Sequence, residues 1–257
     1  MIGASVTSGF VQSEPLGGTN TEMHKLSRYL EAGLVAQHEP IKVVASPFLF
    51  LQPETVGPQQ VQMAIAAKPT LVIGLDFLFW SCYGEGKTDE DRLQRFEKGL
   101  KLLEQFDCAL VVGDLPDASA AVGGMLRADQ MPSDDALKSA NKRLKEWATA
   151  RKQVTIIPLS DFMRNAVVNK EIKIGGFAVP EGKSRALLQR DKLHPSPPGC
   201  SLIALAILES VQATRQGDYA KDIRHDAKEI FQIVSKSTKS PTTAESKPAS
   251  TAAPAAN

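Results

Sequence analysis

Four short runs of apolar residues recur along the chain and predict the strands of a buried sheet. They occupy residues 42–46, 70–74, 108–113 and 154–158. In each run the apolar residues follow one another directly instead of alternating with polar ones. This pattern is typical of parallel strands that helices cover on both faces, so the runs predict a parallel sheet inside the protein.

Between and after these runs, apolar residues return every three or four positions, which predicts amphipathic helices. The expected helices cover residues 21–37, 89–106 and 219–234, a segment that Ser133 caps and that continues through Trp147, and a segment that begins at Pro198. The alternation of strands and helices with short loops predicts a three-layer α/β/α sandwich around a parallel sheet. In such sheets the chemistry gathers at the carboxyl ends of the strands.

Composition divides the chain into one domain and a tail. Residues 235–257 contain only Ser, Thr, Ala, Pro and Lys with one Glu and one Asn, too few apolar groups to offset the entropy of ordering. We therefore expect a single domain over residues 1–234 and a disordered segment over 235–257. Only Met1 and Ile2 precede the first turn, which is short for a strand and predicts that the natural polypeptide starts upstream. No signal-peptide pattern is present, and the compartment, cytoplasmic or secreted, stays open.

Charge, apolar runs and cysteines argue against several classes of function. The chain has 30 basic and 29 acidic residues, a formal charge of +1, whereas nucleic-acid-binding proteins usually have a basic surplus. The longest unbroken apolar run, residues 202–208, is far shorter than the ~18 residues of a membrane span. The three cysteines form no Cys-x-x-Cys pair, so neither a zinc site nor a redox motif is expected.

Two segments that follow strands carry candidate chemistry. In the first, Ser5 lies in a turn between Gly3 and Gly9, which can expose the hydroxyl as a nucleophile and offer the Ser5 N–H to an anion. A plain polar turn and a phosphate-cradling loop are the alternatives, although the Gly-Lys-Ser/Thr of a Walker-type loop is absent. In the second, Asp76 follows the run 70–74 and could be a base, a metal ligand or a helix cap.

The third segment pairs a carboxylate with a histidine. Asp191 precedes His194 by three positions, so a tight turn can bring the carboxylate onto Nδ1 of the imidazole. That contact fixes the tautomer and leaves Nε2 free as a base. A surface turn with a capping aspartate would show the same spacing.

Taken in their order along the chain, these three segments resemble the sequence blocks of the SGNH (GDSL-type) hydrolase family. The matching positions are Gly3, Ser5, Thr7 and Gly9 of the first block, Gly74 of the third, and Asp191 and His194 of the fifth. The likeness covers residues 1 to about 215. It implies a flavodoxin-like fold and a serine esterase that needs no metal and no cofactor.

The resemblance also implies a role for each matching residue. Ser5 would attack the ester carbonyl, with His194 as its base and Asp191 orienting that base. The Ser5 N–H, Gly74 and the side chain of Asp76 would lie at the oxyanion or the substrate. The expected partner is a small-molecule ester or an acylated carbohydrate, and the oligomeric state is left open.

Three positions depart from the family pattern. Ala4 replaces an aspartate, residues 46–53 lack the glycine of the second block, and Asp76 stands in place of an asparagine. An asparagine donates an N–H to the oxyanion, whereas an ionised aspartate only accepts. Asp76 could be protonated through burial, could turn away into a structural role, or could leave a poor catalyst. We favour the last, which predicts low activity that Asp76→Asn improves.

Two other classes of function stay open. A protein of the same fold with a defective oxyanion site could bind a ligand without turning it over. A flavodoxin-like protein could bind phosphate or a nucleotide at the turn 3–9, but it would have no use for the pair Asp191 and His194. Three aromatic residues after Asp76 would line an acyl pocket or, more commonly for aromatics, fill the core. They are Phe77, Phe79 and Trp80.

Overall fold

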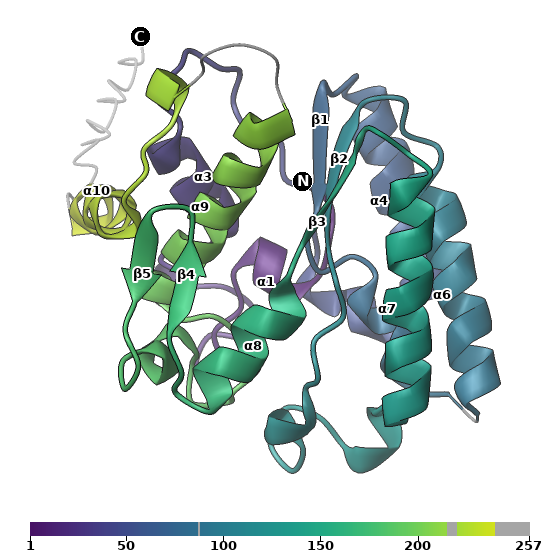
Figure 1. The fold of residues 1–257 in the computed structure, drawn as a ribbon. Coiled ribbons are helices and arrows are strands. Elements are labelled where there is room, and N and C mark those ends of the chain that lie inside the picture. Colours follow the sequence, from purple (N-terminus) through teal and green to yellow (C-terminus); the bar gives the residue numbers. More distant parts are fainter. Residues whose placement is uncertain (87, 215–219, 240–257) are drawn as a thin grey trace, which may run out of the picture.

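The computed structural model describes residues 1–86, 88–214 and 220–239, and at its centre is a parallel sheet of three strands (Figure 1). The strands are β1 (Leu71–Gly74), β2 (Ala109–Gly113) and β3 (Val154–Ile157), in that order across the sheet. Val72 pairs with Leu110 in the first ladder. Three of the four predicted strands are thereby confirmed. Because they are parallel, their carboxyl ends lie at the same edge of the sheet.

The fourth prediction, a buried strand over residues 42–46, is wrong. This segment forms no named strand and is exposed or only partly buried. Backbone hydrogen bonds join residues 1–3 to this segment on one side and to β1 on the other. They run from the Val44 N–H to the Met1 carbonyl (2.9 Å), from the Ser46 N–H to the Gly3 carbonyl (3.1 Å) and from the Ile2 N–H to the Ile73 carbonyl (3.0 Å). The chain therefore reaches Ser5 directly from the middle of the sheet.

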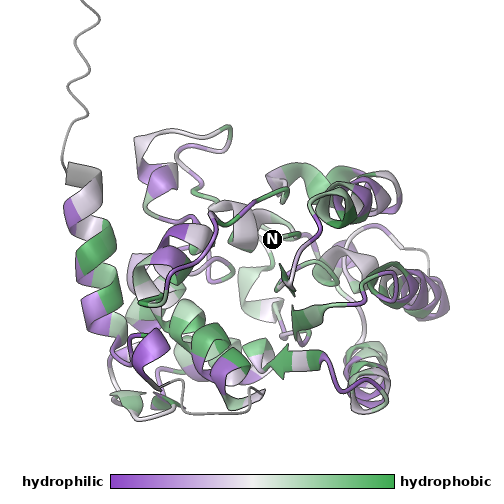
Figure 2. Ribbon diagram, turned by 90° about the horizontal axis from the view of Figure 1, so that it is seen from above, coloured by the Kyte–Doolittle hydropathy of each residue, from purple (hydrophilic) through white to green (hydrophobic). Residues whose placement is uncertain are grey.

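Helices flank the sheet on both sides (Figure 1). On one side lie α4 (Pro53–Ala66), α6 (Asp89–Leu103) and α7 (Asp134–Thr149). On the other lie α1 (Ser5–Ser8), α3 (Leu26–Gly33), α8 (Leu159–Val167) and α9 (Pro197–Thr214), with α10 (Ala227–Lys239) packed against α3 and α9. The protein is a mixed α/β structure, and hydrophobic residues are concentrated along its central strands (Figure 2).

The predicted start of α7 has the expected cap. The Ser133 hydroxyl accepts a hydrogen bond from the Ala136 N–H at 3.1 Å, which satisfies one of the free donors of the first turn. α6 begins in the same way, with the Thr88 hydroxyl oxygen 3.1 Å from the Asp91 N–H. Both helices start where short polar side chains precede the apolar stripe, so these two boundaries could be predicted from local sequence alone.

The helix predicted over residues 21–37 is interrupted. It consists of α2 (Thr19–Glu22) and α3, and the chain between them is extended at Lys25. Gly9, which ends α1 with a φ of +84°, lies against this break: a Cβ on Gly9 would be 2.7 Å from the Lys25 backbone nitrogen. The backbone at the break therefore packs closely against Gly9 at the end of α1, where the sequence predicted a continuous helix.

Other boundaries also differ from the predictions. α10 starts at Ala227 and continues to Lys239, so the first residues of the segment predicted to be disordered are helical; residues 240–257 lie outside the described part. The elements not predicted include α1, α4, α5 (Phe79–Cys82), α8 and the hairpin of β4 (Ile172–Ile174) and β5 (Phe177–Val179). α4 contains Pro58, and the hairpin strands have three residues each, so their sequence signals are weak.

Candidate active site

Ser5, His194 and Asp191 meet beside the carboxyl ends of β1 and β2. The Ser5 Oγ is 2.8 Å from Nε2 of His194, and Nδ1 of His194 is 2.7 Å from Oδ2 of Asp191. When Nδ1 donates its proton to Asp191, Nε2 is the acceptor for the Ser5 hydroxyl proton. The structure thus brings the three residues into one hydrogen-bonded chain, the arrangement in which a base activates a nucleophile.

The turn that carries His194 folds back as its spacing predicts. Asp191 Oδ1 accepts hydrogen bonds from the backbone N–H groups of Leu193 and His194, both at 3.0 Å, and Lys192 adopts a left-handed φ of 58°. Burial by itself would raise the pKa of Asp191, but the hydrogen bond and charge of His194 and the two N–H groups together hold that pKa below its usual value. The side chains of Asp191 and His194 are each only 3% exposed, so little water competes with their contact.

The Asp76 carboxylate holds the first turn of α1 by four hydrogen bonds. Oδ1 accepts from the Ala4 N–H (3.0 Å) and the Thr7 hydroxyl (2.5 Å), and Oδ2 accepts from the N–H groups of Val6 (2.8 Å) and Thr7 (3.4 Å). Because both oxygens are acceptors, the carboxylate has no O–H to offer to an oxyanion. Asp76 therefore has a structural role in this turn, and its placement at the oxyanion stays a prediction.

This arrangement leaves the Ser5 N–H free. Asp76 accepts hydrogen bonds from the N–H groups of Ala4 and Val6, the two neighbours of Ser5 in sequence. The Ser5 N–H donates to none of the residues that the structure describes. A free backbone N–H on the nucleophile itself is a common component of an oxyanion hole.

Gly74, the glycine expected at the substrate, and Gly57, the first glycine after residues 46–53, both lie away from Ser5. Gly74 is part of β1, where a Cβ would meet the Ile2 side chain at 3.2 Å and Phe77 at 3.4 Å. Gly57 lies inside α4 and packs against Phe77. Neither residue lines the cavity beside Ser5. In the described structure Gly74 has a packing role, and the substrate contact that the resemblance implied for it stays a prediction.

Gln60 is a residue of the site that the sequence did not indicate. It is 2% exposed. Its Oε1 accepts from the Gly3 N–H at 2.7 Å, and its Nε2 donates to the Gly3 carbonyl at 3.0 Å. This pair of bonds holds the chain just before Ser5 as a neighbouring strand would. Gln60 comes from α4, and no spacing in the sequence links it to a residue 57 positions away.

Gly3 is the position at which one added methyl group should disturb the turn of Ser5 most directly. Its φ is +146°, and a Cβ there would lie 2.3 Å from Asp76 Oδ1 and 2.7 Å from the Thr7 hydroxyl oxygen. We expect Gly3→Ala to lower the free energy of unfolding by about 1–3 kcal/mol, because the carboxylate must move away. Thermal unfolding measures this loss.

The matched control for Gly3→Ala is Gly17→Ala. Gly17 also has a positive φ, +98°, but a Cβ there would meet nothing within 4 Å. Gly17→Ala therefore adds backbone strain without a clash. If both substitutions lower the free energy of unfolding by the same amount, the clash of the added methyl group with Asp76 does not contribute to the loss.

A small cavity of about 50 Å³ opens beside Ser5 and His194. Most of its wall is apolar and includes Phe79, Trp80, Leu115, Phe162, Met163 and Ile203. Phe77 does not belong to this wall; it packs in the core against Gly57 and Gly74. Of the three aromatic residues singled out from the sequence, two therefore face the candidate site and one has the core role.

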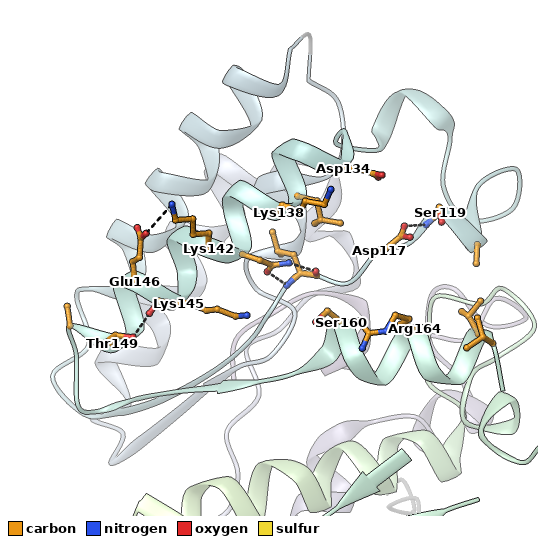
Figure 3. Close-up of a pocket in the computed structure, with 17 residues that line it drawn as sticks. Asp117, Ser119, Asp134, Lys138, Lys142, Lys145, Glu146, Thr149, Ser160 and Arg164 are labelled. Carbon is orange, nitrogen blue, oxygen red and sulfur yellow. Dashed lines mark hydrogen bonds and ion pairs between the residues drawn. The ribbon is translucent and has the colours of Figure 1, made fainter. Parts of the chain in front are cut away.

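A larger cleft of about 1090 Å³ lies between α7 and α8. Figure 3 shows Lys145 extending from α7 toward α8 and Arg164 on α8 at the other side of this space. Neither Ser5 nor His194 lines the cleft. Leu115, in the chain after β2, lines both the cleft and the small cavity.

Within the described ranges, no three His, Cys, Asp or Glu side chains are grouped so that they could hold a metal ion. In the same part of the chain, no helix combines the length and the apolar character needed to cross a membrane. Comparisons with protein-family models, with curated proteins and with solved structures found no match to this chain. A function must therefore be argued from the geometry of the site.

Proposed function

We propose that the protein is a serine hydrolase that cleaves carboxylic esters through an acyl-enzyme. The observation that carries this proposal is the hydrogen-bonded chain from Ser5 through His194 to Asp191, which ends at an apolar cavity. A nucleophile, a base and a group that orients the base are the side chains that acyl transfer to water uses in serine hydrolases. The proposed substrate is an ester of a small or carbohydrate-linked acyl group.

The acyl-enzyme forms in two proton transfers. The Ser5 Oγ attacks the ester carbonyl carbon while its proton passes to Nε2 of His194, and Asp191 stabilises the resulting imidazolium through Nδ1. The carbonyl oxygen becomes an oxyanion, for which the Ser5 N–H is the available donor. His194 then gives the proton to the alcohol oxygen as the carbon–oxygen bond breaks, and the acyl group stays on Ser5.

Water completes the cycle in the same site. His194 accepts a proton from the water molecule as its oxygen attacks the acyl carbon of the ester on Ser5. The proton returns to the Ser5 Oγ as that bond breaks, and the carboxylic acid leaves. Asp76 takes no part in these transfers. It acts as a positioning residue, because its four hydrogen bonds fix the turn that presents Ser5.

We also propose that the protein has the flavodoxin-like fold of the SGNH (GDSL-type) hydrolases. The position of residues 1–3 beside β1, with Ser5 following at once, supports it, as does the location of His194 just before α9. A second candidate, a binding protein of the same fold with little turnover, is favoured by one observation. Asp76 accepts instead of donating, so the oxyanion lacks a donor that is typically worth about 10²–10³ in rate.

Labelling with a fluorophosphonate probe tests the proposed chemistry. The probe reacts with a serine only when a base activates it, so we expect a single adduct on Ser5 that mass spectrometry locates. His194→Ala should abolish the adduct. Ser8→Ala is the matched control, because Ser8 belongs to the same short helix and should leave labelling unchanged. An adduct on another residue, or none, would exclude the assigned nucleophile.

A further inference from the structure

We propose that the cavity beside Ser5 binds the acyl group of the ester and that Leu115 closes it, so that short apolar acyl chains are selected. This proposal rests on the proposed esterase function and adds the substrate class to it. Three observations carry it: the size of the cavity, the chemistry of its wall, and the position of Leu115 between two spaces.

The size of the cavity limits the chain length. Its volume is about 50 Å³, and one water-sized position takes up roughly 10–15 Å³. The cavity therefore has room for about three to five non-hydrogen atoms. Since the carbonyl carbon must lie against the Ser5 Oγ, the chain beyond it can have about three to five carbons, as in butanoyl to hexanoyl groups.

The wall of the cavity favours an apolar chain. Phe79, Trp80, Phe162 and Met163 line it, and each is only 7–9% exposed. The two acidic residues of the wall, Asp76 and Asp114, already have partners of their own. The Asp114 oxygens accept from the Ser160 N–H (2.7 Å) and hydroxyl (2.5 Å), and those of Asp76 accept from the α1 turn. Neither carboxylate can donate a hydrogen bond, so a negatively charged acyl chain would find no donor among these groups.

Leu115 separates this cavity from the open cleft. Among the described residues it alone lines both spaces, and it is 2% exposed. Asn141 of α7 fixes its backbone: the Leu115 N–H donates to Asn141 Oδ1 (2.8 Å), and Asn141 Nδ2 donates to the Leu115 carbonyl (2.7 Å). An acyl chain too long for the cavity would meet this side chain, with the cleft of Figure 3 beyond it.

A series of 4-nitrophenyl esters from acetate to dodecanoate tests the proposal. We expect kcat/KM to rise about fourfold for each methylene buried up to butanoate or hexanoate. It should then fall at least about tenfold by octanoate, because the cavity is full. A kcat/KM that keeps rising to dodecanoate, or that is highest for acetate, would overturn the proposal.

Substitution of Leu115 tests its place in the wall. Leu115→Ala joins the two spaces, so the ratio of kcat/KM for octanoate to that for butanoate should rise at least about tenfold. Leu115→Val, which folds more readily, should raise it less. Leu137→Ala is the matched control, because Leu137 lines only the cleft and should leave the ratio unchanged. An unchanged ratio in both Leu115 variants would refute the assignment.

Binding without turnover separates this proposal from the esterase function. Ser5→Ala, titrated with ethyl butanoate or ethyl octanoate, should show a change in the fluorescence of Trp80 only with butanoate, and Trp80→Phe supplies the background. Selective binding combined with no ester cleavage by the parent would support the pocket and reject the esterase. Ester cleavage without any chain-length preference would reject the pocket and leave the esterase standing.

Discussion

Ser5→Ala is expected to lower ester turnover by about 10⁴- to 10⁶-fold, and His194→Ala by a similar factor. The Ser5 Oγ and His194 Nε2 share one hydrogen bond of 2.8 Å, and the loss of either member of such a unit removes most of their combined effect. Steady-state hydrolysis of 4-nitrophenyl butanoate measures the loss. The double variant should be no slower than the single variants, which is the mark of residues that act together.

Two controls make this result specific. Ser8→Ala, on the same helix, should retain the parent rate, and the unfolding midpoints of the Ser5 and His194 variants should stay near that of the parent. Multiplicative losses in the double variant would mean that the two residues act independently. That outcome would contradict the hydrogen-bonded chain as the catalytic unit.

The pH dependence of turnover follows from the same chain. Turnover needs Asp191 ionised and His194 neutral. Burial would raise the pKa of Asp191, but hydrogen bonds and the His194 charge outweigh it and lower that pKa, so this carboxyl is already ionised across the range in which a histidine base ordinarily loses its proton. The logarithm of kcat/KM should therefore rise with pH with a slope of about one and then level off. A slope near two would mean that Asp191 titrates in the same range.

Asp76→Asn is expected to lower both activity and stability, in contrast to the expectation from the sequence. The Asp76 oxygens accept four hydrogen bonds, but an asparagine offers one acceptor oxygen and turns an NH₂ group toward N–H donors. Each buried donor left unpaired costs about 1–3 kcal/mol. We expect kcat/KM to fall about 10- to 10²-fold, because Ser5 loses its fixed position. Ester kinetics and chemical denaturation measure the two effects.

Asp117→Asn is the matched control for this change. Asp117 Oδ1 accepts from the Ser119 N–H at 2.8 Å, at the start of a short helix over Ser119–Ala121. Asp117 is exposed and does not line the cavity beside Ser5, so Asp117→Asn should leave kcat/KM unchanged. Faster turnover of Asp76→Asn at any pH would restore the oxyanion interpretation of residue 76.

The parts of the site that could be predicted are those encoded by neighbouring residues. Asp191 and His194 lie in one tight turn, so their spacing alone indicates their contact. Ser5 lies between glycines that permit its turn. The strands β1 to β3 could be predicted for a similar reason, because burial on both faces requires an unbroken apolar run.

The parts that could not be predicted depend on contacts distant in sequence. The direction of the Asp76 carboxylate is set by the N–H donors of α1, which lie about 70 positions earlier. Gln60 reaches Gly3 from a helix that the hydrophobic pattern does not reveal. Residues 42–46 have the composition of a buried strand, but they lie beyond residues 1–3 at the side of the sheet. Whether such a segment becomes a buried strand depends on what packs against it, and composition does not specify this.

The long separation between Ser5 and His194 has a consequence for how the protein acquires reactivity. The two residues are 189 positions apart, so the proposed nucleophile leaves the ribosome long before its proposed base is synthesised. Closing so long a loop is slow compared with forming local helices. Under the proposed function, Ser5 stays inert until the late segment docks. The hydrogen bond from Gln189 to the Phe10 carbonyl (2.8 Å) helps to hold that segment in place. During refolding, the onset of fluorophosphonate labelling would report when these distant segments have joined.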